Sequence, residues 1–60
     1  MVSLIVIDII KNQSEQNSKM VLRDFSGNVM EESVNDVDIN SQHIKIGDQV
    51  HFEMDRIVKD

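Results

Sequence analysis

The sequence predicts an all-β domain with at most one short helix: a small, strongly bent antiparallel sheet or a partly open barrel of four to five strands. Three observations lead to this fold class. Residues 2–10 are mostly β-branched, residues 43–54 alternate apolar and polar side chains, and Ser26-Gly27-Asn28 forms a turn signal between two apolar runs. With 60 residues, the chain has room for one domain, residues 1–60, and for one core.

The first predicted strand, residues 2–10, is apolar on both faces. Such a strand needs cover on both sides, so we expect a closed barrel or a homodimer to bury it. Asp8 interrupts the run, no basic residue precedes it and no small-residue cleavage site follows, so we expect neither a signal peptide nor a membrane span. Residues 11–18 lack apolar side chains and predict an exposed loop.

A hairpin is predicted next, with residues 20–25 as one strand and the Ser26-Gly27-Asn28 turn leading into a returning strand at residues 29–34. The returning segment is ambiguous. Residues 29–36 also fit a helical stripe, and Asn28 with Glu31 resembles a capping box, so a short helix there remains an alternative. Residues 35–42 are polar and predict a connection.

The last part of the chain has the clearest alternation, interrupted by a predicted bend at Gly47-Asp48. At Ile57 the alternation shifts by one residue, which predicts a β-bulge or a strand end. The histidines fall opposite the apolar positions, so we expect them to face solvent. The predicted core consists of Leu4, Val6, Ile7, Leu22, Ile44, Ile46, Val50, Phe52 and Met54.

Composition and motifs argue against an enzyme. Asp36-Val37-Asp38-Ile39-Asn40 has the spacing that opens a calcium loop, but Ser41 and Gly47 occupy the positions that need Gly and Glu, so we expect no metal. The sequence has no nucleophile elbow, phosphate loop or dinucleotide fingerprint, and we expect no catalytic residues and no cofactor. The chain has no Cys, which fits a cytoplasmic protein.

Two segments carry a resemblance to a known family. Residues 21–29 (VLRDFSGNV) and residues 44–52 (IKIGDQVHF) together resemble OB-fold modules, and the Gly-Asp-x-Val step is also similar to SH3-like barrels. The resemblance implies a small β-barrel. If the family's binding face carries over, its matching positions are Arg23 and Phe25, with Lys45 and His51 as neighbours.

The net charge of −5 opposes non-specific contact with nucleic acids or anionic membranes. We therefore expect a small non-enzymatic interaction or regulatory module that binds a protein partner, or itself, through a sheet edge or an acidic face. The acidic candidates are Glu31, Glu32, Asp36 and Asp38. The alternative is an OB-like module that binds single-stranded nucleic acid, and the third hypothesis is an acidic nucleic-acid mimic that inhibits its target.

Overall fold

Three strands form an antiparallel meander in the first half of the chain. The computed structural model describes residues 2–60 and has β1 at Leu4–Lys11, β2 at Asn17–Arg23 and β3 at Val29–Asn35. The predicted hairpin is confirmed, because β2 and β3 pair from Asn17↔Asn35 to Arg23↔Val29. Asp24 holds the turn by accepting hydrogen bonds from the Ser26 and Asn28 backbone amides at 2.9 and 2.8 Å.

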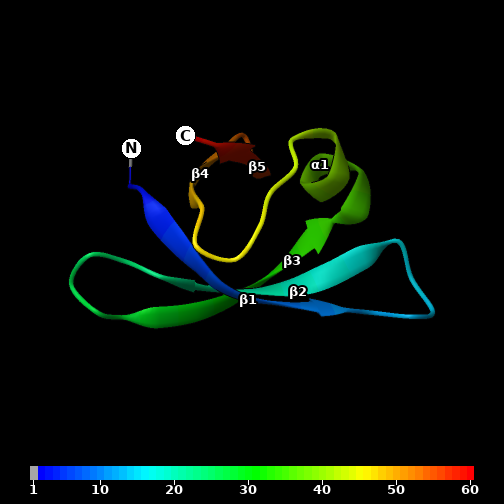
Figure 1. Ribbon diagram of the computed structural model, residues 1–60, viewed down its shortest axis with the longest axis horizontal. Helices are drawn as coiled ribbons and strands as arrows, with labels where there is room; N and C mark the ends of the chain where they lie inside the picture. Colours follow the sequence, from blue (N-terminus) through cyan, green and yellow to red (C-terminus); the bar gives the residue numbers. More distant parts are fainter. Residues whose placement is uncertain (1) are drawn as a thin grey trace.

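The second half of the chain returns to the other side of β1. Helix α1 (Asp36–Ser41) follows β3 directly, and a loop leads to β4 (Gln49–Glu53) and β5 (Arg56–Lys59). The strand order is β3-β2-β1-β4-β5, in one open antiparallel sheet. A meander whose fourth strand returns beside the first is a Greek key. In Figure 1, α1 and the β4–β5 hairpin both lie on one side of the meander.

Helix α1 lies within the segment that was predicted to be a polar connection, and the alternative of a helix at residues 29–36 is wrong. The backbone of β3 pairs with β2 along its whole length, which prevents it from coiling. The cap is Asn35 rather than Asn28: its side-chain oxygen accepts a hydrogen bond from the Val37 amide at 2.8 Å. Ile39 is the buried residue of the helix.

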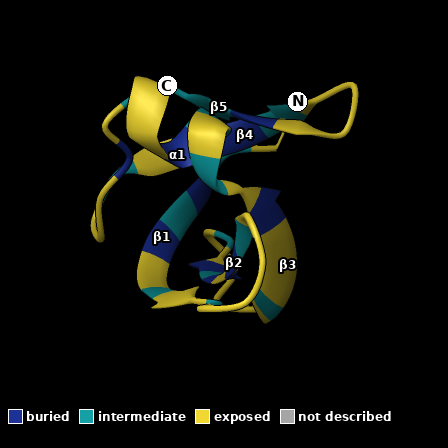
Figure 2. Ribbon diagram, turned by 90° about the vertical axis from the view of Figure 1, so that its right-hand side faces the viewer, coloured by how far each residue is buried: buried dark blue, intermediate teal, exposed yellow. Residues whose placement is uncertain are grey.

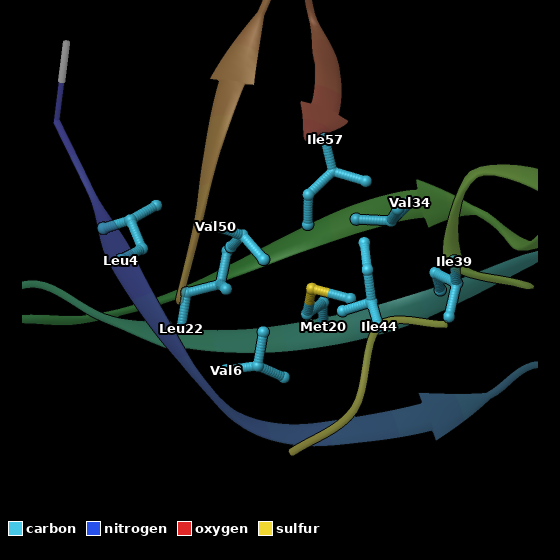
Figure 3. Close-up of a cluster of buried hydrophobic side chains, with 9 residues drawn as sticks. All are labelled: Leu4, Val6, Met20, Leu22, Val34, Ile39, Ile44, Val50 and Ile57. Atoms are coloured by element: carbon cyan, nitrogen blue, oxygen red, sulfur yellow. The ribbon is translucent and has the colours of Figure 1, made fainter. Parts of the chain in front are cut away.

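The core lies between the meander and the elements that cover it. Val6, Met20 and Leu22 point from β1 and β2 toward Val50 and Ile57 of the β4–β5 hairpin (Figure 3). The buried predicted core residues are Leu4, Val6, Leu22, Ile44 and Val50, and the buried residues that the prediction missed are Met20, Val34, Ile39 and Ile57. Phe52 is half-buried against this cluster.

Three predicted core positions are wrong, because the alternation was extended through breaks in the strands. In β1, Val6 pairs with Leu22 but Asp8 pairs with Val21, so Ile7 is the extra residue of a β-bulge and is 38% exposed. Ile46 is 62% exposed in the loop before β4, and Met54 is 96% exposed in a two-residue turn.

That turn also explains the phase shift at Ile57. Met54 and Asp55 have φ of 50° and 64°, as in a tight type I′ hairpin turn, so β4 ends and β5 begins there. The predicted strand end is therefore confirmed. The expected loop at residues 11–18 is shorter than predicted: Lys11 belongs to β1, and Ser18 in β2 is buried.

Candidate functional site

The sheet has two free edges, and they differ. Strands β3 and β5 stand at its two ends, so each has one side without a strand neighbour among residues 2–60. On β5, the Gln42 side chain takes the place of that neighbour. Its Nε2 donates to the Ile57 carbonyl at 3.0 Å, and its Oε1 accepts from the Lys59 amide at 2.8 Å. The edge of β5 is therefore capped by a side chain of the chain itself.

The edge of β3 carries charge. Glu31 and Glu32 are exposed, as is Ser33, and β3 is largely exposed in Figure 2. Glu31 also forms an ion pair with Lys19, with 3.4 Å between Nζ and Oε1. Charged residues on an edge strand discourage pairing with another copy of the same edge. The candidate site is therefore the free edge of β3, whose charged residues disfavour pairing with the β3 edge of a second copy.

A hollow of about 650 Å³ lies beside this edge. Val34 of β3, Val37 of α1, and Phe52 and Ile57 of the hairpin form its apolar lining. Among its polar lining residues, Arg56 donates a hydrogen bond to Asp38 at 2.6 Å. The hollow thus brings apolar surface from three elements to the side of β3 that faces the core.

The predicted acidic positions do not form one face. Asp36 accepts a hydrogen bond from the Ser18 hydroxyl at 2.7 Å and is ion-paired with Lys11. The hydrogen bonds from Lys11 and Ser18 lower the pKa of the Asp36 carboxyl. Asp38 is paired with Arg56, and its side chain is only 13% exposed. This leaves Glu31 and Glu32 as the exposed members of the predicted set.

The four predicted binding residues are not gathered at one place. Arg23 ends β2, and Phe25 lies in the β2–β3 turn, where its side chain is 71% exposed. Lys45 is exposed in the loop before β4. His51 lies in β4 and is buried, so the prediction that it faces solvent is wrong.

His51 is held between two carboxylates. Its Nδ1 lies 2.5 Å from Asp60 Oδ1, and its Nε2 lies 2.5 Å from Glu53 Oε2. Asp60 also accepts a hydrogen bond from the Ser3 hydroxyl at 2.9 Å. The hydrogen bonds to Asp60 and then Glu53 raise the pKa of the His51 imidazole, which outweighs the opposing effect of its burial. Asp60, the residue after β5, therefore contacts the His51 ring from nine residues away in the sequence. The alternation of apolar and polar residues within β4 does not reveal such a contact.

Most basic side chains are already neutralised. Ion pairs hold four of the six, namely Lys11, Lys19, Arg56 and Lys59, which leaves Arg23 and Lys45 without one in the described part of the chain. Over the same residues 2–60 there is no group of three or more potential ligands able to hold a metal ion. No helix there is long and apolar enough to cross a membrane.

Comparison of the chain with protein-family models, with curated proteins and with solved structures finds no match. The fold class therefore rests on strand pairing and order. The candidate site rests on the geometry of the β3 edge and of the hollow beside it.

Proposed function

We propose that the protein is a small non-enzymatic interaction module that accepts an extended, basic segment of another protein on the free edge of β3. The observation that carries this proposal is the asymmetry between the edges. Gln42 hydrogen-bonds the Ile57 carbonyl and the Lys59 amide of β5, whereas β3 is left with an exposed edge that bears Glu31 and Glu32. An exposed edge is a template for strand addition.

The partner's affinity would come from main-chain hydrogen bonds, and its specificity from alternate side chains. On an added strand, one set of side chains faces the core side of the sheet, next to the hollow lined by Val34 and Phe52. Apolar residues fit that side. The other set lies on the opposite face, within reach of Glu31.

Charge defines which partner fits. An antiparallel pair of two β3 edges would bring Glu31 and Glu32 of one copy against the same residues of the other, and like charges directly opposite each other are destabilising. Lys or Arg on the face of the added strand that meets Glu31 would instead form cross-strand ion pairs. A basic extended segment of a different protein is therefore the proposed occupant, and a second copy is disfavoured at this edge.

A ten-residue peptide of alternating Lys and Val, blocked at both ends, is a direct probe. We expect it to shift the backbone amide NMR signals of residues 29–34 more than those of the β4–β5 hairpin. Reversing the charge on the face that receives the Lys side chains, with Glu31→Lys, should weaken binding by about tenfold, or about 1.4 kcal/mol. The matched control Glu53→Lys makes the same charge change at an exposed position of β4, away from β3 in the sheet, and should alter binding far less.

Strand addition also predicts a dependence on the peptide backbone. An edge strand bonds its neighbour through alternate residues, so only every second peptide amide faces β3. N-methylation of the amides in that phase should abolish binding, and N-methylation of the other phase, whose amides face away, should leave binding nearly intact. Equal effects of the two phases would overturn the proposal, because charge attraction alone does not distinguish them. Amide shifts centred outside β3 would overturn it as well.

An OB-like module that binds single-stranded nucleic acid is the second candidate, and one observation favours it. The order β3-β2-β1-β4-β5, with α1 between β3 and β4, corresponds to a five-stranded, partly open Greek-key arrangement, which is how the OB-fold is built. We propose OB-like kinship on this topology, ahead of an SH3-like barrel. Such sites combine a basic groove with stacked aromatic residues.

Charge and aromatic content place nucleic-acid binding second. Only Arg23 and Lys45 lack ion pairs among the described basic residues, and Phe25 is the one strongly exposed aromatic side chain there. We expect no binding of labelled single-stranded oligonucleotides tighter than roughly 100 μM at about 0.15 M salt, measured by fluorescence anisotropy. Micromolar affinity that is lost in Arg23→Ala or Phe25→Ala would reverse the ranking.

Acidic mimicry of nucleic acid ranks third. A mimic needs several free carboxylates spaced over one surface, and the ion pairs of Asp36 and Asp38 remove two of the four candidates. Titration with a basic polypeptide such as polylysine would separate this hypothesis from strand addition. A mimic should bind it with a steep salt dependence and without the phase-dependent effect of N-methylation.

A further inference from the structure

Within residues 2–60, nothing covers one face of the meander. Met20 and Leu22 are buried on the core side of β2, so the residues between and beside them lie on the opposite side, here called the outer face. In Figure 1, α1 and the β4–β5 hairpin lie away from this face. The outer face carries the apolar residues Ile5, Ile7, Ile10, Val21 and Val29 and the charged residues Asp8, Lys19, Arg23 and Glu31.

The bulge in β1 adds to this surface. Val6 is fully buried and Ile9 packs against the core, so the bulge leaves two consecutive residues, Ile7 and Asp8, on the outer side. Ile7 is 38% exposed, Ile10 on the same strand is 50% exposed and Val29 on β3 is 59% exposed. Exposed apolar side chains that share one uncovered sheet face with charged residues are typical of an interaction site.

The charges of the outer face balance, although the chain as a whole carries −5. Two are basic and two are acidic. Lys19 and Glu31 already pair across β2 and β3. Asp8 and Arg23 have no ion pair within residues 2–60, although the Asp8 carboxylate accepts a hydrogen bond from the Ile9 amide at 2.9 Å. The outer face thus has one acidic and one basic residue without an ion pair, Asp8 and Arg23. Two copies of this face can pair the acid of one with the base of the other.

We propose that the outer face packs against the outer face of a second copy to form a two-fold dimer, in which Arg23 of each copy pairs with Asp8 of the other. A two-fold contact is reciprocal, so one such pair implies the other. Consider a two-fold axis that lies in the plane of the interface and crosses the line from Asp8 to Arg23 at its midpoint and at a right angle. This axis places Asp8 of each copy opposite Arg23 of the other copy, so both ion pairs form. Asp8 is opposite Val21, and Arg23 is opposite Ile5, so Ile5, Ile7 and Val21 lie around that axis.

Sedimentation equilibrium tests the dimer. We expect a dimer mass at about 100 μM, and single variants Arg23→Asp and Asp8→Arg should each weaken the dimer by about tenfold or more. The double variant Arg23→Asp/Asp8→Arg should restore it, because the reciprocal pair is re-formed with the charges exchanged. Lys45→Asp changes charge as Arg23→Asp does, but lies outside the outer face and should leave association unchanged.

An apolar variant addresses the rest of the face. Ile10→Glu should favour the monomer, whereas Val37→Glu, on an exposed helix position, should not. Circular dichroism would verify that each variant is folded. A monomer mass for the parent protein at about 100 μM would overturn the proposal. So would a dimer that Arg23→Asp, Asp8→Arg and Ile10→Glu all leave unaffected, or a double variant that remains as weak as the single ones.

Discussion

Two methionines allow the core to be tested with identical chemistry. Met20 of β2 has no exposed surface, whereas Met54 of the β4–β5 turn is 96% exposed. Met→Ala at either position removes the same atoms. Only at Met20 do these atoms fill space between the meander and the hairpin, so only Met20→Ala leaves a cavity.

The expected magnitudes differ clearly. Truncation of a buried Met costs about 2–5 kcal/mol, while a surface substitution usually stays within about 0.5 kcal/mol. A domain of this size has a free energy of unfolding of about 3–9 kcal/mol, taken as 0.05–0.15 kcal/mol per residue. A loss of about 3 kcal/mol lowers the melting temperature by roughly 12–24 °C at this chain length. Met20→Ala should therefore keep only about 0–6 kcal/mol of unfolding free energy and melt well below the parent.

Urea and thermal denaturation followed by far-ultraviolet circular dichroism would measure both variants against the parent. Met54→Ala should unfold at the parent's midpoint. If Met54→Ala loses as much stability as Met20→Ala, then Met54 belongs to the core, as simple alternation predicts, and the two-residue turn described above is wrong. If neither variant loses stability, the core is not on the described side of β2.

Three further predictions concern single residues. The fold raises the pKa of His51, so the stabilisation that its protonated ring provides is fully present below the ordinary pKa of about 6.5. This stabilisation is lost as the pH rises through the pKa of the folded state. Urea midpoints that fall with rising pH in the parent, but not in His51→Gln, would confirm this. Gly27 has φ of 94°, so Gly27→Ala should cost about 1–2 kcal/mol in thermal denaturation, whereas Ser26→Ala should be nearly neutral. Gln42→Ala should speed hydrogen exchange of the Lys59 amide, measured by NMR; unchanged exchange would mean that Gln42 does not protect the edge of β5.

The fold class could be predicted because its signals are local. The turn at residues 24–28 depends on Asp24 and Gly27, which are neighbours in sequence, and the polar and apolar pattern of β2 is carried by Met20 and Leu22. The errors arose where one strand was read through a break. The bulge at Ile7 and the turn at Met54 each change which side of the sheet the next residue faces.

The candidate site was less predictable, because its features join distant segments. Asp36 was predicted as part of an acidic face, but it is bound by Lys11 and Ser18, which pair with each other beside the β1–β2 loop and lie 25 and 18 residues away in sequence. Sequence alone does not indicate that Gln42 reaches the backbone of β5, fifteen residues from its Ile57 contact. The roles predicted for Arg23 and for the two glutamates of β3 stay predictions until binding is measured.

The cap on β5 determines how many strands the sheet can gain. A sheet with two open edges can grow in both directions, since each added strand leaves the next copy a place to pair. Here the Gln42 side chain hydrogen-bonds the edge of β5 at one end of the sheet. At the other end, the charges of Glu31 and Glu32 disfavour pairing with the β3 strand of another copy. If a basic strand from another protein adds to β3 as proposed, that strand ends the array. Each copy of the chain then accepts one strand, and strand addition does not propagate into a fibre.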